Sequence, residues 1–264
     1  MKTAILFASY LPHEDRLYIG KQFFNVFVNN FKDADIYVGI NPGTVDGWAS
    51  ILDEYKKELN IEYGYVERDL YSKSDAGAFQ KALLMLKDSG KKYDNIWFVH
   101  TKGGHYNDSH RAEQRDFMIE NFLNKREILE EQMHSKSNYG VYGPVITVNM
   151  TPWPQNKCPD NFLDVYYDFP YRSTDLCYLY TFYLMKGNIV HDFINNCSNN
   201  FWEDKKNIYF FEDAFPHVAT KMGYEQLYGI TQNFPKGNIV TDDRIKNIKN
   251  KWMKDNGINY SNPD

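Results

Sequence analysis

The sequence has few cysteines, no long apolar run and no concentration of basic residues. Its cysteines, Cys158, Cys177 and Cys197, are odd in number and form no C-x-x-C pair, so we expect a reduced, cytoplasmic setting. No apolar stretch approaches the roughly 18 residues of a membrane-spanning helix, so no transmembrane segment is expected. The net charge is −5 and basic residues form no stripe, which argues against a nucleic-acid partner.

The first half of the chain alternates between the patterns of strands and helices. Apolar residues at helical or strand spacing predict the elements 3–9 (strand), 17–31 (helix), 35–40 (strand), 47–59 (helix), 61–66 (strand), a helix beginning near residue 74, and 95–100 (strand). Such a series predicts an α/β fold with a mostly parallel sheet flanked by helices. Ligands of these sheets bind beyond the carboxyl ends of the strands.

The second half is less regular, and we expect it to belong to the same domain, 1–264. One long helix is predicted at 111–133, an extended run at 139–148, a strand or buried helix at 176–185 and a helix at 188–196. We divide this domain into the regular part at residues 1–105, the less regular part at 106–240 and a tail at 241–264. The irregular, aromatic segment between 149 and 175 has the length of a functional loop.

The segment from His100 to Gly104 carries the strongest candidate chemistry. It follows a predicted strand, so it lies at the edge of the sheet where ligands bind. Gly103 and Gly104 allow a ligand to approach the backbone closely. Lys102 would place a positive charge where a diphosphate would sit. An ordinary strand-end loop with a surface lysine is equally consistent with the spacing.

The histidines of the same region allow a second interpretation. His100, His105 and His110 recur every five residues, with Asp108 between the last two, and these residue types are ligands for zinc and related metals. A spacing of five does not place side chains on one helix face, and the glycines indicate a loop. These histidines would suit a metal-dependent carbohydrate hydrolase or deacetylase, which is the second interpretation of this loop beside a diphosphate site.

Glu212 and Asp213 are the candidate general bases. They follow the apolar run 208–211 and precede a predicted helix, and a carboxylate at the end of a buried strand is placed to accept a proton. Acidic residues also begin helices for electrostatic reasons alone, and that interpretation stays open.

Other acidic residues lie near the ends of the predicted strands. Asp33 and Asp35 form a literal D-x-D, but they precede the second strand and lie on the wrong side of the sheet for a ligand, so we interpret them as a turn. Asp69 and Asp75 follow the third strand on the ligand side. Their carboxylates could accept hydrogen bonds from a nucleotide base or a ribose hydroxyl. Acidic residues exposed on a loop are equally consistent with the sequence.

Three segments, 74–82, 93–103 and 212–224, form a recognisable combination. They contain SDAGAFQKA, YDNIWFVHTKG, and EDAFP followed by MGY. Together they resemble glycosyltransferases of the GT-A type, most closely the rhamnan-synthesis and capsule-type sugar transferases. In that group H-T-K stands where others carry a metal-binding D-x-D.

The resemblance implies a polysaccharide-building enzyme with a nucleotide-sugar donor and a glycan or other hydroxyl acceptor. It also implies roles for individual residues. The nucleotide would contact Ala8, Ser9 and Tyr10, with Asp69 and Asp75 near the base and ribose. The diphosphate would lie against His100, Thr101, Lys102 and Gly103. Glu212 or Asp213 would act as the base, and the acceptor side would include Arg111 and Trp153.

The departure from D-x-D predicts that no metal is required. Lys102 would replace the cation, with Arg111 or Arg115 assisting, whereas dependence on Mn²⁺ or Mg²⁺ is the alternative. A third interpretation is a non-catalytic carbohydrate-binding relative that keeps the fold and has lost the chemistry, because fold alone does not establish activity.

Overall fold

The structure is a computed structural model that describes residues 1–68, 75–105, 109–144, 146–148, 176–178, 181–203, 210–211, 215–216, 218–219 and 222–228. Its main sheet has seven strands in the order β3-β2-β1-β4-β8-β5-β9. These strands are β1 (Thr3–Ser9), β2 (Asp35–Ile40), β3 (Asn60–Tyr65), β4 (Asn95–His100), β5 (Tyr139–Gly143), β8 (Tyr183–Lys186) and β9 (Glu225–Tyr228). A second sheet pairs β6 (Ile146–Val148) with β7 (Leu176–Tyr178).

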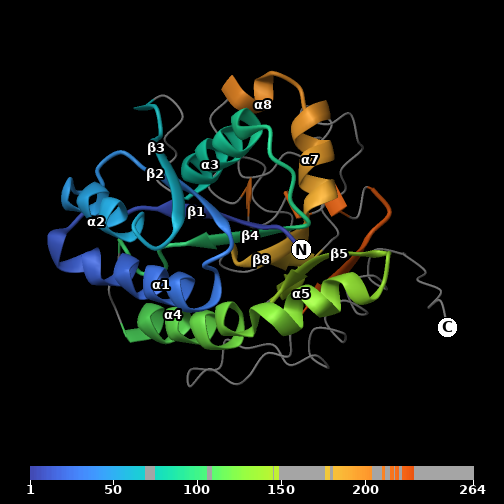
Figure 1. The fold of residues 1–264 in the computed structure, drawn as a ribbon, viewed down its shortest axis with the longest axis horizontal. Helices are drawn as coiled ribbons and strands as arrows, with labels where there is room; N and C mark the ends of the chain where they lie inside the picture. The colour runs from blue at the N-terminus through green and yellow to red at the C-terminus, as the bar shows by residue number, and fades with distance from the viewer. Residues whose placement is uncertain are drawn as a thin grey trace.

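Helices cover both faces of the main sheet (Figure 1). One face carries α1 (Leu17–Asn30), α4 (Ser109–Asn121) and α5 (Arg126–Ser135), and the other carries α3 (Ala76–Ser89) and α7 (Gly187–Asn196). The other helices among the described residues are α2 (Gly47–Tyr55), α8 (Asn200–Glu203) and the short 3₁₀ turns Glu14–Arg16 and Leu123–Lys125. The predicted α/β class, with a mostly parallel sheet flanked by helices, is confirmed.

Within the main sheet, the described strands run in parallel except for β8. β1 pairs in parallel with both β2 and β4, β2 pairs in parallel with β3, and β5 pairs in parallel with β9. β8 is antiparallel to its neighbours β4 and β5. The carboxyl ends of β1 to β4 therefore meet at one edge of the sheet, while β8 ends at the opposite edge, where β4 begins.

Two hydrophobic cores lie on the two faces, because alternate side chains of each strand point to opposite sides. In β1, Ile5 and Phe7 belong to the core beneath α1, α2, α4 and α5, whereas Leu6 and Ala8 belong to the core beneath α3 and α7. All four residues are buried. The sheet is thus enclosed on both sides, and ligands can reach it at its edges.

One predicted helix of the second half is wrong in its extent, and one predicted extended run is divided at its turn residues. The helix predicted at 111–133 is interrupted by the turn at Leu123–Lys125. Phe122, just before that turn, is buried with its ring 4.5 Å from that of Trp97, so core packing outweighs continuation of the helix. The run predicted at 139–148 divides into β5 and β6, because β5 ends before Pro144, which has no backbone N–H to donate.

A close backbone contact sets the position of α3. A Cβ atom on Gly39 of β2 would lie 1.9 Å from the carbonyl oxygen of Ala78, so only glycine permits this approach. The contact places the first turn of α3 beside the carboxyl end of β2. In the described part of the chain, none of the helices has the length and apolarity needed to cross a bilayer.

Candidate functional site

The strand order reverses between β1 and β4. From β1 the chain builds outward through β2 and β3, and it then returns to add β4 on the other side. In open α/β sheets such a reversal leaves a crevice beyond the carboxyl ends of the two central strands, where ligands bind. The segments at the ends of β1 and β4 contain the predicted site residues Ala8–Tyr10 and His100–Gly104.

Hydrogen bonds join the segment after β1 to the segment after β4. The backbone N–H of Tyr10 donates to Thr101 Oγ1 over 2.9 Å, and the backbone N–H of Thr101 donates to the carbonyl of Ala8 over 3.0 Å. A Cβ on Gly104 would lie 2.2 Å from the carbonyl oxygen of Tyr10. The structure therefore brings together the predicted residues after β1 and those after β4, and it leaves no room for a side chain at residue 104.

The predicted nucleotide contacts of β1 differ in what they offer to a ligand. Ala8 and Ser9 are buried. The Ser9 hydroxyl donates to the carbonyl of Gly39 over 3.1 Å and accepts from Trp48 Nε1 over 3.2 Å, so it holds β1 to its neighbours. The Tyr10 ring lies 5.5 Å from the ring of His105, which follows β4. Tyr10 and His105 thus bring two aromatic rings together at this edge.

A tight turn presents Lys102. The backbone N–H of Gly104 donates to the carbonyl of Thr101 over 3.1 Å, and Gly103 has φ +84°, in the left-handed region that favours glycine. The two glycines thus have separate roles: Gly103 supplies the conformation of the turn, and Gly104 supplies its approach to Tyr10. The Lys102 side chain is half-buried.

Arg115 of α4 is hydrogen-bonded to the backbone of this turn. Its Nη1 donates to the carbonyl of Lys102 over 3.3 Å, and its side chain is almost completely buried. Within the described ranges, the carboxylate paired with it is Asp116, with Oδ1 4.0 Å from Nε. Arg111 lies one turn earlier on the same side of α4. The turn therefore has a second, buried positive charge next to Lys102.

His100 and Asp75, both predicted site residues, are neighbours. His100 Nδ1 lies 3.6 Å from Asp75 Oδ2, and the His100 ring packs 5.1 Å from that of Phe182. Asp75 precedes the first turn of α3, which the Gly39 contact holds in place. The sequence indicated both residues but contained no sign that they pair, since 25 positions separate them.

The metal-hydrolase interpretation gains no support from the described residues. No three His, Cys, Asp or Glu side chains among them are grouped as metal ligands would be. His100 contacts Asp75 and Phe182, whereas His105 contacts Tyr10. Asp108 and the side chain of His110 lie outside the described residues.

The D-x-D of Asp33 and Asp35 lies at the opposite edge of the sheet, as its position before β2 predicts. The hydrogen bond from Arg126 lowers the pKa of Asp33. Burial acts to raise the pKa of Asp35, but hydrogen bonds from Tyr93 and Lys91 outweigh it and lower the pKa. Asp35 Oδ2 accepts from Tyr93 Oη over 2.6 Å and from Lys91 Nζ over 2.9 Å. Both carboxylates are engaged in joining elements of the fold.

Four predicted site residues lie outside the described part of the chain. They are Asp69, Trp153, Glu212 and Asp213. The roles given to them as ribose, acceptor and base contacts stay predictions.

No protein-family model matches the chain, and no curated protein is similar to it in sequence. Among solved structures, it is similar to S. aureus TarS 1–349, with 14% identity and a TM-score of 0.46 over 87% of this chain and 60% of that one. It is also similar to the mannosyltransferase PcManGT from Pyrobaculum calidifontis, in complex with GDP-Man and Mn²⁺, with 11% identity and a TM-score of 0.41 over 99% and 66%. The chain spans less than two thirds of either protein. We take no residue role from them.

Proposed function

We propose that this chain is a glycosyltransferase that moves a sugar from a nucleotide-sugar donor to a hydroxyl group of a glycan or other acceptor. The observation that carries the proposal is the junction of β1 and β4 at the reversal of strand order, where Lys102 is presented on a glycine turn. Arg115 lies behind the same turn. A diphosphate is the ligand that suits two cations and a close backbone approach at this edge.

The proposed reaction uses Lys102 and Arg115 of this turn together with a carboxylate that is predicted from the sequence. The bond between the sugar carbon and the donor's phosphate oxygen breaks, and the nucleoside diphosphate leaves with the electron pair. Lys102, with Arg115 behind it, stabilises the charge that develops on that leaving group. The acceptor oxygen bonds to the same sugar carbon, and its proton passes to a carboxylate. Glu212 or Asp213 is proposed for that base on the grounds of its sequence position.

We further propose that transfer proceeds without a metal ion. The support is that cationic side chains occupy the turn after β4, while the chain's D-x-D is engaged at the far edge of the sheet. Titration of activity with Mn²⁺ and with EDTA tests this: activity that persists in EDTA supports it, and a strict Mn²⁺ requirement contradicts it.

Binding of nucleotides is the first test. A thermal-shift titration with UDP, GDP, dTDP and CMP should show stabilisation by at least one of them, because a ligand that binds the folded state raises its stability. Lys102→Ala should weaken that binding about 10-fold or more, since a hydrogen bond to a charged group contributes about 1.5–3 kcal/mol. Lys57→Ala, at an exposed lysine beyond α2, is the matched control and should bind as wild type.

A measurement of donor turnover distinguishes a glycosyltransferase from a non-catalytic relative and from a metal-dependent hydrolase. Wild type should release nucleoside diphosphate from the matching nucleotide sugar, and Lys102→Ala and Glu212→Ala should both be slower. Nucleotide binding without turnover of any donor would favour the non-catalytic relative. Stoichiometric zinc in the purified protein, with no stabilisation by nucleotides, would favour the hydrolase.

A further inference from the structure

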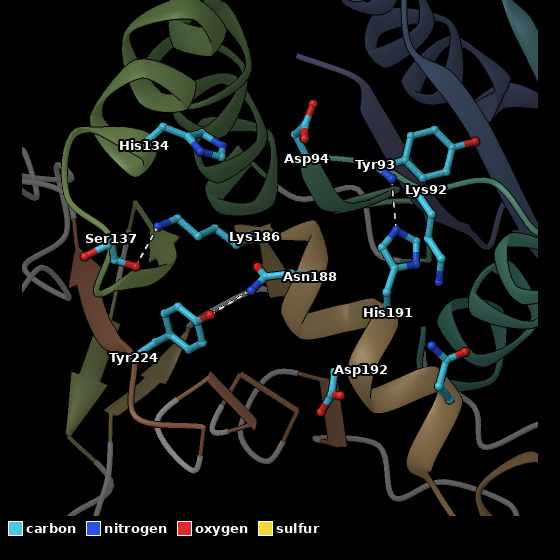
Figure 2. A pocket seen from close by; sticks show the side chains of 11 residues that line it. Lys92, Tyr93, Asp94, His134, Ser137, Lys186, Asn188, His191, Asp192 and Tyr224 are labelled. Carbon is cyan, nitrogen blue, oxygen red and sulfur yellow. Dashed lines mark hydrogen bonds between the residues drawn. The ribbon is translucent and has the colours of Figure 1, made fainter.

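A second candidate site lies at the opposite edge of the main sheet. Here β4 begins and β8 ends, and an open groove with a volume of about 680 Å³ lies between α5, α7 and the segment before β9 (Figure 2). That volume is in the range of ligand sites in proteins. Nothing in the sequence indicates this groove, because its walls come from four separate stretches of the chain.

One wall is a polar face of α7. Asn188, His191, Asp192 and Asn195 line the groove, and their spacing of three, four and seven residues puts them on one side of the helix. The other side of α7 carries buried apolar residues. The polar face runs for seven residues, or about 10 Å at the rise of an α-helix. Amide, imidazole and carboxylate groups thus follow one another along the groove.

The formal charges of the lining cancel. Lys92 and Lys186 are opposed by Asp94 and Asp192. Burial, with the positive charge of Lys92, lowers the pKa of His191 to about 4, so that imidazole is neutral near pH 7. An anion or a cation would each meet like charges in this groove, whereas a neutral polar molecule would meet donors and acceptors of both kinds.

Several of these groups are held in place by the fold (Figure 2). Lys186 Nζ donates to the carbonyls of Lys136 and Ser137, each over 3.0 Å, which uses two of its three N–H bonds. Asn188 Nδ2 donates to the Tyr224 hydroxyl over 2.7 Å, which leaves the amide oxygen as an acceptor. Tyr224 is half-buried and adds an aromatic surface to this row of polar groups.

The geometry points to a binding site for a neutral oligosaccharide in this groove, separate from the nucleotide site. Sugar hydroxyls both donate and accept hydrogen bonds, which suits a lining that mixes amides, carboxylates, a neutral imidazole and the ammonium groups of two lysines. The apolar faces of sugar rings suit an aromatic neighbour such as Tyr224. This site rests on the proposed function only in that the bound chain would be a remote part of the acceptor glycan.

Binding can be tested on the whole chain without catalysis. Saturation-transfer NMR with maltohexaose, cellohexaose, mannohexaose and chitohexaose, each at about 10 mM, detects affinities as weak as millimolar. At least one probe should bind. The double variant Asp192→Ala/Asn195→Ala should weaken that binding about 10-fold or more, as expected for the loss of about 1.4 kcal/mol. Asp88→Ala, at an exposed acid near the end of α3, is the control and should bind as wild type.

Each outcome decides the proposal. Absence of binding by all four probes, or equal binding by the double variant when its unfolding temperature matches wild type, would overturn it. Preferential binding of inorganic phosphate in the groove would assign the site to an anion instead. A saturating nucleoside diphosphate should leave oligosaccharide affinity within about twofold, and direct competition would show that the two sites are one.

The two proposals fail in different ways. Stabilisation by a nucleotide without oligosaccharide binding would leave the transferase standing and remove the groove. Oligosaccharide binding that depends on α7, without any response to nucleotides, would keep the groove and remove the transferase.

Discussion

Gly104→Ala tests the candidate site by its geometry alone, since it changes no charge. A Cβ at this position would lie 2.2 Å from the carbonyl oxygen of Tyr10 and 3.2 Å from that of Thr101. The nearer atom belongs to the backbone and cannot rotate away, so the segments after β1 and β4 must separate by about 1 Å to reach ordinary contact. Overpacking of this kind costs about 1–3 kcal/mol.

The functional loss should exceed the loss of stability. A displacement of about 1 Å in a site that positions a reacting group can reduce activity about 100-fold. Titration of nucleoside diphosphate by thermal shift measures binding, and release of nucleoside diphosphate measures turnover. Both should fall in Gly104→Ala, while urea unfolding shows that the variant is folded.

Gly90→Ala is the matched control. Gly90 ends α3 with φ +64°, and a Cβ atom added there would meet no other part of the protein within 4 Å. The substitution should cost about 1 kcal/mol through backbone strain and leave nucleotide binding unchanged. If Gly104→Ala binds and turns over as Gly90→Ala does, the turn after β4 is not the nucleotide site and the reasoning fails.

Three further predictions concern the framework. Arg126→Met should lower the free energy of unfolding by about 3–5 kcal/mol in urea, because it leaves the buried carboxylate of Glu130 without its cation; Lys125→Met, at an exposed neighbour, should change it by less than about 0.5 kcal/mol. Gly39→Ala should cost at least about 3 kcal/mol by pushing α3 off the sheet, and an unchanged unfolding midpoint would contradict that contact. His191 accepts from the backbone N–H of Tyr93 over 2.9 Å, and its pKa is lowered to about 4. The folded state therefore binds fewer protons than the unfolded state, so about 2 kcal/mol of stability present above pH 6.5 should be lost as the pH falls toward 4. His191→Gln should lose that part of the pH dependence, and an unaltered profile would exclude this histidine as its source.

The sequence predicted the ends of the central strands well because strand and helix periods are local properties. The bounds of β2 and β4 agree with their apolar runs, and the position of His100–Gly104 follows from where β4 ends. The interpretation of Asp33 and Asp35 as a turn is likewise consistent with their contacts at the far edge. None of these inferences required knowledge of which strands are neighbours.

What could not be predicted depends on long-range contacts. The pairing of His100 with Asp75, and of Arg115 with the carbonyl of Lys102, joins residues that no pattern relates. The reversed direction of β8 was equally hidden, because an apolar run reads the same in either direction. The polar side of α7 follows from the spacing of its residues. Its place in a groove could not be predicted, because the sequence does not show that this helix lies beside the start of β4.

The strand β4 connects the two edges of the molecule and sets their separation. Its six residues, Asn95–His100, span about 17 Å at the rise of an extended chain. Helices cover both faces of the sheet, so a single molecule reaching both ends must pass around the outside. A bivalent inhibitor that joins a nucleotide mimic to an oligosaccharide would therefore need a linker well over about 17 Å, and a shorter one would gain nothing from its second arm.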